Sequence, residues 1–457
     1  MLNKFLTLNC VLVIAVGSVV VNFPDGLVAL AFVTALSVIA ITIIRRSPEE
    51  KEFLTTLFLV ALALRMAFGI FVHIYDLRSF FGGDALAYDA YGQNLLDVWM
   101  GRDQLRGVLL FQDDPASGSA WGMNYLTAII YAVFGHNIFA AQSFCAVIGA
   151  ATSPMMYFCA KKIFNNLNVA KLSAISIAVF PSFIIWSGQL LKDGLIIFLL
   201  VTIMTMVMQL QEKLNYRALA VLVFSLAGIL SLRFYIFYIV LVAVVGSFLI
   251  GSSSSNRSLF RNAVVMILLA FALIYFGIGR NVSTEYEVFG NLQRVQSSRS
   301  DLARAADSGF GTETDVSTPE GALSAMPVGF AYLMFAPFPW QASNLRQAIT
   351  IPEVLVWWAM IPFLIMGLIY AVKYRLRNAF PVLIFSLLLT LAYSVFQGNV
   401  GTAYRQRTQI QVFLFIFIGV GWTVYKERKE NERILRLAAQ KRVDNQFAGG
   451  GRLSQNV

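Results

Sequence analysis

Residues 190–210 read LLKDGLIIFLLVTIMTMVMQL, and this stretch decides the fold. After Lys192 and Asp193 it contains no charged residue. An α-helix needs about 20 mainly apolar residues to cross the hydrocarbon core of a bilayer. Ionised groups at bilayer depth are costly, so the length of the run and its lack of charge predict a membrane-spanning helix.

The composition extends this prediction to the whole chain. Of its 457 residues, 58% are hydrophobic and only 13% are charged, whereas a soluble domain is about half apolar and a quarter charged. The sequence therefore predicts an all-α, polytopic transmembrane helical bundle with about 12 spans. The predicted spans are residues 5–21, 27–44, 53–73, 138–160, 169–187, 190–210, 216–232, 234–250, 262–279, 353–372, 379–396 and 409–425.

Two further apolar segments, 121–135 and 327–338, are short or interrupted by proline and glycine. We expect them to form re-entrant or interfacial helices in the loops outside the membrane. The twelve spans and these loops would make one transmembrane domain over residues 1–425. The tail, 426–457, is basic at its start and is expected to be cytoplasmic and partly disordered.

The basic residues set the orientation, because Lys and Arg are enriched in cytoplasmic loops. Placing the basic loops and the tail inside is consistent with every predicted crossing and puts both termini in the cytoplasm. The long loops 74–137 and 280–352 then lie outside. The net charge of +10 comes from residues scattered between apolar runs. This pattern argues for a bilayer and against a nucleic-acid partner.

The first outside loop contains Gly82-Gly83-Asp84, followed by Asp89 and Tyr91. If a helix begins at Asp84, its carboxylate is suited to cap that helix. The functional alternative is a general base that faces a cavity at the membrane surface. Asp89 and Tyr91 would then support substrate binding.

The last outside loop carries Arg405 and Arg407 beside the membrane, against the positive-inside trend. They either extend their guanidinium groups to the interface or bind an anion. A guanidinium matches phosphate oxygens in a bidentate way. Such a phosphate at a bilayer surface would belong to a lipid headgroup or a lipid-linked substrate.

Lys192 and Asp193 fall at the outer end of a predicted span. They either neutralise each other or belong to a functional site, as ionisable residues inside membranes often do. Arg233 lies at an outer hairpin tip and would join the same positive, substrate-binding pocket.

These features resemble the GT-C glycosyltransferase superfamily, and within it the bacterial protein mannosyltransferases and lipid A aminoarabinose transferases. The resemblance covers about residues 60–210. Gly83-Asp84 looks like the family's catalytic loop, although Ala85 stands where many members have a second acid. The apolar segment from Tyr125 that ends in Phe134-Gly135 is similar to a segment of the family. The stretch from Phe180-Pro181-Ser182 to Lys192-Asp193-Gly194 looks like the following pair of spans.

The resemblance implies transfer of a sugar from a polyprenyl-phosphate donor to a lipid-linked glycan, a polysaccharide or a protein, at the outer face of the cell inner membrane. Asp84 would deprotonate the acceptor hydroxyl. Arg405, Arg407, Lys192 and Arg233 would bind the departing phosphate. This chemistry needs no nucleotide, and a divalent metal ion stays an open alternative.

Two other functions fit the sequence. An O-antigen or exopolysaccharide polymerase would share the many helices, the large outside loop and the arginines. It would use a polyprenyl-diphosphate oligosaccharide instead of a polyprenyl-monophosphate sugar. A lipid or sugar transporter is the alternative outside enzymes. The chain has no clear duplicated halves, and its polar residues gather outside instead of at mid-bilayer, which argues against transport.

Overall fold

The computed structural model describes residues 2–21, 23–102, 121–250, 256–275, 291–304, 308–311, 314–342 and 344–450. In these residues the chain is almost entirely helical, as expected, and no strand occurs. Parts of the two predicted outside loops, 103–120 and 276–290, lie outside the described residues. The helices are α1 (Leu2–Val20), α2 (Asp25–Arg45), α3 (Lys51–Ile74), α4 (Arg78–Phe81), α5 (Asp84–Trp99), α7 (Trp121–Phe134), α8 (Ile138–Phe164), α9 (Leu167–Val179), α10 (Pro181–Ser187), α11 (Lys192–Glu212), α12 (Tyr216–Leu232), α13 (Phe234–Ile250), α14 (Asn256–Tyr275), α16 (Leu292–Arg304), α17 (Pro319–Phe335), the 3₁₀ turn η1 (Pro339–Gln341), α18 (Leu345–Tyr374), α19 (Leu376–Phe396) and α20 (Val400–Gly450).

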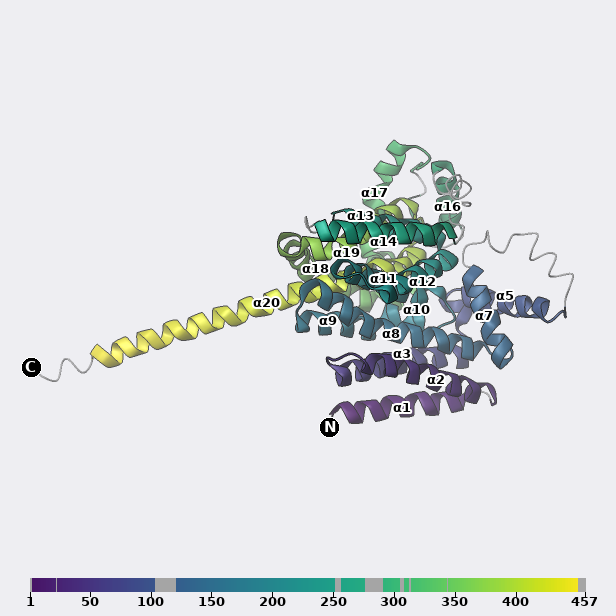
Figure 1. The fold of residues 1–457 in the computed structure, drawn as a ribbon, viewed down its shortest axis with the longest axis horizontal. Helices are drawn as coiled ribbons and strands as arrows, with labels where there is room; N and C mark the ends of the chain where they lie inside the picture. Colours follow the sequence, from purple (N-terminus) through teal and green to yellow (C-terminus); the bar gives the residue numbers. More distant parts are fainter. Residues whose placement is uncertain are drawn as a thin grey trace, which may run out of the picture.

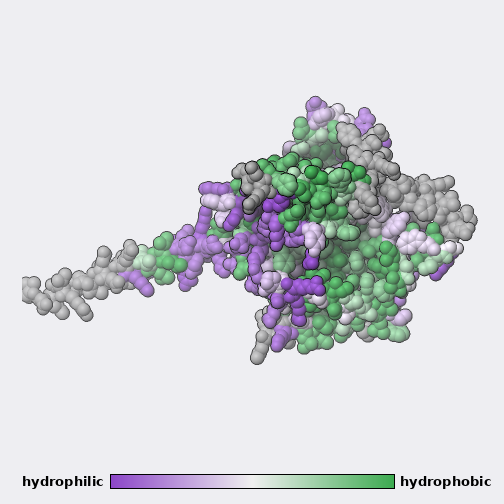
Figure 2. Space-filling view, in the orientation of Figure 1, coloured by the Kyte–Doolittle hydropathy of each residue, from purple (hydrophilic) through white to green (hydrophobic). Residues whose placement is uncertain are grey.

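The long helices lie side by side and roughly parallel (Figure 1). Helices α1, α2, α3 and α8 pack against one another along one flank, and α11 lies inside the bundle against α8, α12 and α20. The short helices α5 and α7 pack together at one end of the bundle, and α20 leaves the body at the opposite end. Figure 2 shows hydrophobic residues over the body and hydrophilic residues where α20 emerges.

Seven of the described helices are long and apolar enough to cross a membrane, or eight if the bent pair α9 and α10 forms one span. The predicted count of about twelve is therefore not confirmed. Apolar stretches shorter than 18 residues account for the difference. Four of these shorter stretches coincide with or overlap predicted spans, namely Leu6–Gly17, Tyr216–Leu232, Phe234–Ile250 and Leu259–Ile274.

The predicted span 169–187 is broken in the structure. Helix α9 ends at Val179, and α10 continues at an angle of 54°. Pro181 causes the break because it has no N–H to donate to the carbonyl of Ile177 and restricts the residue before it to an extended conformation. Phe180 accordingly has ψ of 127°. This break creates the short helix that later supports the functional site.

Proline has a different outcome in the predicted segment 327–338. Pro327 lies inside α17, which packs along α19 and ends only at Phe335. The segment 121–135 is helical as expected and forms α7.

The predicted boundary at residue 425 does not coincide with a break. Helix α20 runs on to Gly450, and its residues 425–441 are mostly exposed. Its sequence explains the continuity, since Glu, Lys, Arg, Leu and Ala are strong helix formers. Opposite charges four residues apart, such as Arg428 and Glu432, add to helix stability.

The close contact between α18 and α20 depends on glycine. A methyl group on Gly421 of α20 would overlap the carbonyl oxygen of Phe363, and one on Gly367 of α18 would overlap that of Phe417. Small residues let transmembrane helices approach closely enough for extensive van der Waals contact. The two glycines therefore fix the distance between these helices.

We expect Gly421→Ala to lower the free energy of unfolding by about 1–3 kcal/mol, because the added methyl group forces two backbones apart. Thermal unfolding of the detergent-solubilised protein would measure this loss. Gly246→Ala is the matched control, since its methyl group would lie 4.0 Å from the nearest atom, in the Phe380 ring. Equal melting temperatures for the two variants would contradict this explanation of the α18–α20 contact.

Candidate functional site

Helix α5 begins with Asp84. The preceding turn uses Gly82 with φ of +122°, a backbone conformation that favours glycine. Gly83 is the N-cap residue, so Asp84 stands in the first helical turn, where a negative charge is favourable. Its side chain is 48% exposed, and one carboxylate oxygen accepts a hydrogen bond from Nη1 of Arg405 at 2.6 Å. The carboxylate thus pairs with a guanidinium 321 residues away in the sequence.

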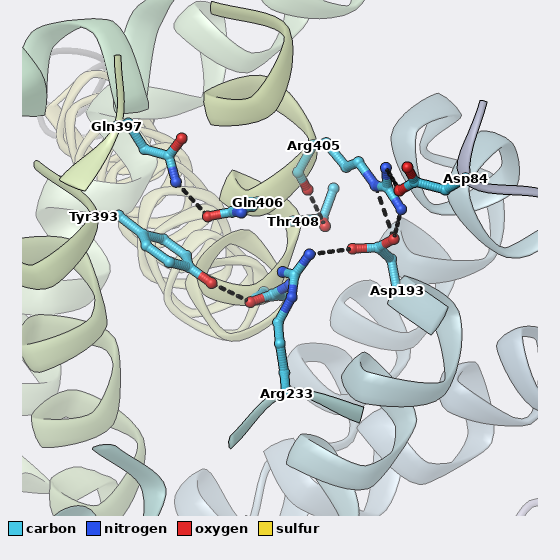
Figure 3. A network of polar contacts seen from close by, with 9 residues as sticks. Asp84, Asp193, Arg233, Tyr393, Gln397, Arg405, Gln406 and Thr408 are labelled. Carbon is cyan, nitrogen blue, oxygen red and sulfur yellow. Dashed lines mark hydrogen bonds and ion pairs between the residues drawn. The ribbon is translucent and has the colours of Figure 1, made fainter. Parts of the chain in front are cut away.

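Arg405 lies in the second turn of α20 and contacts a second carboxylate. Its Nε and Nη2 both donate to Oδ2 of Asp193, at 2.8 and 2.5 Å. Asp193 is fully buried in the first turn of α11, and its Oδ1 lies 3.6 Å from Nη2 of Arg233. Figure 3 shows Arg405 between Asp84 and Asp193, with Arg233 reaching Asp193 from the other side. Four segments of the chain therefore meet in one ionic cluster.

Lys192 adds a third cation beside this cluster. Its side chain is almost completely buried and interacts electrostatically with Asp193, Arg233 and Arg405. Three cations and two carboxylates leave the group with a net charge of +1. A buried site with excess positive charge is suited to bind an anion, because charges attract more strongly where water is excluded.

An aromatic ring supports Arg405 from one face. The centre of the Trp186 ring, in α10, lies 5.4 Å from the guanidinium carbon of Arg405. A cation over an indole ring is stabilised by the electrons of the ring face. The guanidinium is thereby fixed by two carboxylates and one ring.

Tyr88 lies one turn after Asp84 and is buried beside the cluster. Burial and the carboxylates of Asp84 and Asp193 raise the pKa of its phenol above the usual value. Tyr88 therefore keeps its proton and is available as a hydrogen-bond donor. Tyr88 was not among the predicted site residues, although its place four residues after Asp84 puts the two side chains on the same face of a helix.

The predicted residues Asp89 and Tyr91 do not join the ionic cluster. Asp89 accepts hydrogen bonds from the Tyr131 hydroxyl at 2.5 Å and interacts with Nε2 of His136 at 2.8 Å. These contacts join α5 to the end of α7. Tyr91 lies half-exposed on α5.

Arg407 also turns away from the cluster, although Arg405 is two residues before it. Its Nη1 donates to the carbonyl oxygens of Met334 and Ala336, at 3.2 and 2.8 Å. These carbonyls belong to the end of α17, where no further helical N–H is available. Arg407 thus anchors α17 to α20 in the structure.

A second buried polar group lies beside the ionic cluster. Glu353 of α18 accepts hydrogen bonds from Ser182 of α10 and from the Tyr404 hydroxyl of α20, the latter at 2.8 Å. The sequence offered one signal for it, since Glu353 is an acid at the start of a predicted span. The group joins α10, α18 and α20 next to Arg405.

Comparison with protein families gives one match. Residues 119–278 match the family model described as dolichyl-phosphate-mannose-protein mannosyltransferase. The matched residues make up about a third of the chain, and they make it similar to the GT-C superfamily of membrane glycosyltransferases. The matched region includes α10, α11, Asp193 and Arg233, and thus part of the ionic cluster. No curated protein matches the chain.

A metal site is not apparent in the described part of the chain. Within those residues, no group of three or more His, Cys, Asp or Glu side chains is close enough together to hold a metal ion. Asp84 and Asp193 instead pair with Arg405 and Arg233.

We expect Asp193→Asn to lower the free energy of unfolding by about 3–5 kcal/mol, because it leaves two buried guanidinium groups without their shared carboxylate. Melting curves in detergent would measure the loss. Adding Arg233→Met should restore part of it by removing one unpaired cation.

Glu212→Gln is the control, because the Lys162–Glu212 pair is exposed and contributes at most about 1 kcal/mol. Equal melting temperatures for Asp193→Asn and Glu212→Gln would show that the buried pairs do not hold the cluster together.

Proposed function

We propose that this protein is a GT-C-type glycosyltransferase, which transfers a sugar from a polyprenyl-monophosphate donor to a hydroxyl group of a lipid-linked glycan, polysaccharide or protein at the outer face of the membrane. The observation that carries the proposal is the ionic cluster around Arg405. It combines a half-exposed carboxylate with three cations at the end of the bundle where α5 begins. A sugar transferase of this kind needs both a base and a phosphate-binding group.

The charge of the cluster supports a monophosphate donor. A sugar phosphodiester carries one negative charge, which the net charge of +1 balances. When the bond between the sugar and the phosphate breaks, the phosphate takes the electron pair and gains a second negative charge. Arg405, Arg233 and Lys192 then stabilise a charge that develops in the transition state, where such stabilisation is most effective. A diphosphate donor, as a polymerase would use, brings more negative charge than the cluster balances.

Asp84 is the group that we assign as the general base. It accepts the proton of the acceptor hydroxyl while the acceptor oxygen bonds to the anomeric carbon of the sugar. A carboxylate paired with a guanidinium is a weak base, because the positive charge stabilises its ionised form. A donor phosphate that replaces Asp84 on Nη1 of Arg405 keeps the guanidinium paired and releases the carboxylate for this step.

Asp193 and Arg407 take roles other than substrate contact in this proposal. Asp193 is fully buried and holds Arg405 and Arg233 in place. Arg407 holds the end of α17. Asp89 joins α5 to α7, and we place the acceptor on the exposed side of α5, where Tyr91 lies.

The cellular setting remains as the sequence predicts it. We place the protein in the cell inner membrane with both termini in the cytoplasm, because basic residues then lie inside. The exposed, charged part of α20 leaves the bundle at the end opposite α5, which agrees with a cytoplasmic tail and a site outside. The family match favours transfer of a sugar over its transport.

We expect Asp84→Asn to lower the rate of sugar transfer about 10²–10⁴-fold, the usual contribution of a general base. The assay uses the protein in nanodiscs with a panel of radiolabelled polyprenyl-phosphate sugars and measures release of polyprenyl phosphate. Asp97→Asn is the matched control on the same helix, because Asp97 contacts only Gln93 and Arg102 among the described residues. Full activity of Asp84→Asn would remove Asp84 from the mechanism.

We expect Arg405→Ala to weaken donor binding more than Arg405→Lys does. Lysine keeps the charge but loses the planar fork that pairs with two oxygens. Titration of each variant with farnesyl phosphate would give the dissociation constants. Equal constants for the two variants would argue against a bidentate phosphate contact, and Arg102→Ala, at an exposed arginine of the outside loop, serves as the control.

A further inference from the structure

Arg65 is a buried charge that the ionic cluster does not use. It lies in the middle of α3, is almost completely inaccessible to solvent, and forms no salt bridge with any described residue. A cation in such a place is costly unless hydrogen bonds replace its hydration. Arg65 makes four such bonds, and their partners indicate why the charge is there.

Three of the acceptors are backbone carbonyls. Nη2 donates to the carbonyl of Ile177 at 3.0 Å, and Nη1 donates to that of Ala178 at 3.2 Å. Nη1 also donates to the carbonyl of Ala61 in its own helix at 2.9 Å. Ile177 and Ala178 lie at the end of α9, where Pro181 removes a helical donor. A cation is favourable at the end of a helix because the exposed carbonyls carry partial negative charge.

The fourth acceptor lies at the end of α10. Nε of Arg65 donates to the Ser187 hydroxyl at 2.8 Å, and that hydroxyl donates to the carbonyl of Phe183. One guanidinium therefore joins the end of α9, just before α10, to the end of α10. Neighbouring helices come close at the same point, since a methyl group on Gly149 of α8 or Gly194 of α11 would overlap Ser187.

The position of α10 determines the geometry of the ionic cluster. Trp186, the residue before Ser187, supplies the ring beneath Arg405. Asp193 follows only six residues after Ser187, at the start of α11. Both residues that face Arg405 from this side thus depend on the same fixed backbone. On the side of α10 that faces Glu353, Ser182 donates a hydrogen bond to that carboxylate.

We propose that Arg65 is a positioning residue for the phosphate-binding site, because its bonds to Ile177, Ala178 and Ser187 fix α10 and so place Trp186 and Asp193 against Arg405. The inference rests on the proposed function for its meaning in catalysis, but its geometric content is independent of any ligand. Lysine cannot replace Arg65, since a single ammonium lacks the fork that spans two helix ends.

The first experiment measures geometry without a ligand. Asp193→Cys and Arg405→Cys are introduced together in full-length protein whose Cys10, Cys145 and Cys159 are replaced by alanine, and a short bifunctional methanethiosulfonate is added. We expect Arg65→Lys to lose most of the cross-linked product. Asn262→Leu is the matched control, because it also removes a buried side-chain bond to a helix-end carbonyl, that of Phe248, at the far end of α13. Equal cross-linking in Arg65→Lys and Asn262→Leu would overturn the proposal.

The second experiment measures binding of farnesyl phosphate to the protein with its native cysteines. We expect Arg65→Lys to weaken binding about tenfold, the effect of losing a buried hydrogen bond of a charged group, while Asn262→Leu lowers only the melting temperature. In a Trp186→Leu background the effect of Arg65→Lys should shrink, because both changes act on one contact. Fully additive effects would show that Arg65 contributes only to general stability and would overturn the proposal.

The two experiments separate the proposal from the proposed function. If the unaltered protein does not bind farnesyl phosphate, the assigned phosphate site fails, and the cross-linking result still decides whether Arg65 positions Asp193. If binding occurs and cross-linking is insensitive to Arg65, the function stands and the positioning role is rejected.

Discussion

The packing of the helices around the ionic cluster depends on one requirement: the positive charge of Arg405 must be neutralised in a place that little water reaches. Its side chain is 14% exposed, and its guanidinium satisfies this need with Asp84 on one side and Asp193 on the other. These contacts join α5, α11 and α20, which are far apart in the sequence. Because an unpaired buried charge is strongly destabilising, this interaction constrains how the three helices can pack. Of the two carboxylates, Asp193 is fully buried and Asp84 is partly open to solvent.

The short helix α10 connects this ionic cluster to the rest of the bundle. It exists because Pro181 interrupts residues 169–187, whose apolar composition predicted one continuous membrane-spanning helix. The freed carbonyls then need new donors, and Arg65 supplies them from α3. On its other side, Ser182 binds Glu353 of α18. A break that would weaken an isolated helix thus becomes a fixed point, since buried polar groups from two neighbouring helices complete its hydrogen bonds.

The sequence predicted the all-helical class and singled out ionic residues that the structure brings together. The length of an apolar run identifies a membrane span, and an ionised side chain at the edge of a span is costly in any membrane protein. Asp84, Asp193, Arg233 and Arg405 stood out for this reason. The pairing between them was not predictable, because side-chain direction depends on how the helices rotate. Arg405 and Arg407 illustrate this limit, since two positions on one helix point about 200° apart. One faces the ionic cluster, and the other faces the end of α17.

Residues that act through hydrogen bonds to the backbone gave a weaker signal. Arg65 was an isolated charge in a predicted span, and nothing in the sequence connects it to the carbonyls of Ile177 and Ala178. The predicted number of membrane spans is also not confirmed by the structure. Helices α12 and α13 matched their predicted ranges but are 17 residues each, so length alone does not establish that they cross the bilayer.

Helix α20 joins the two faces of the protein without a break. Arg405 lies near its beginning and Lys441 in its exposed part, so about 54 Å of continuous helix separates them at 1.5 Å per residue. A helix of this kind behaves as a stiff rod over such a length. A displacement of the exposed part of α20 would therefore be transmitted along the helix to the Arg405 guanidinium. The close helix contact at Gly421 would act as the pivot.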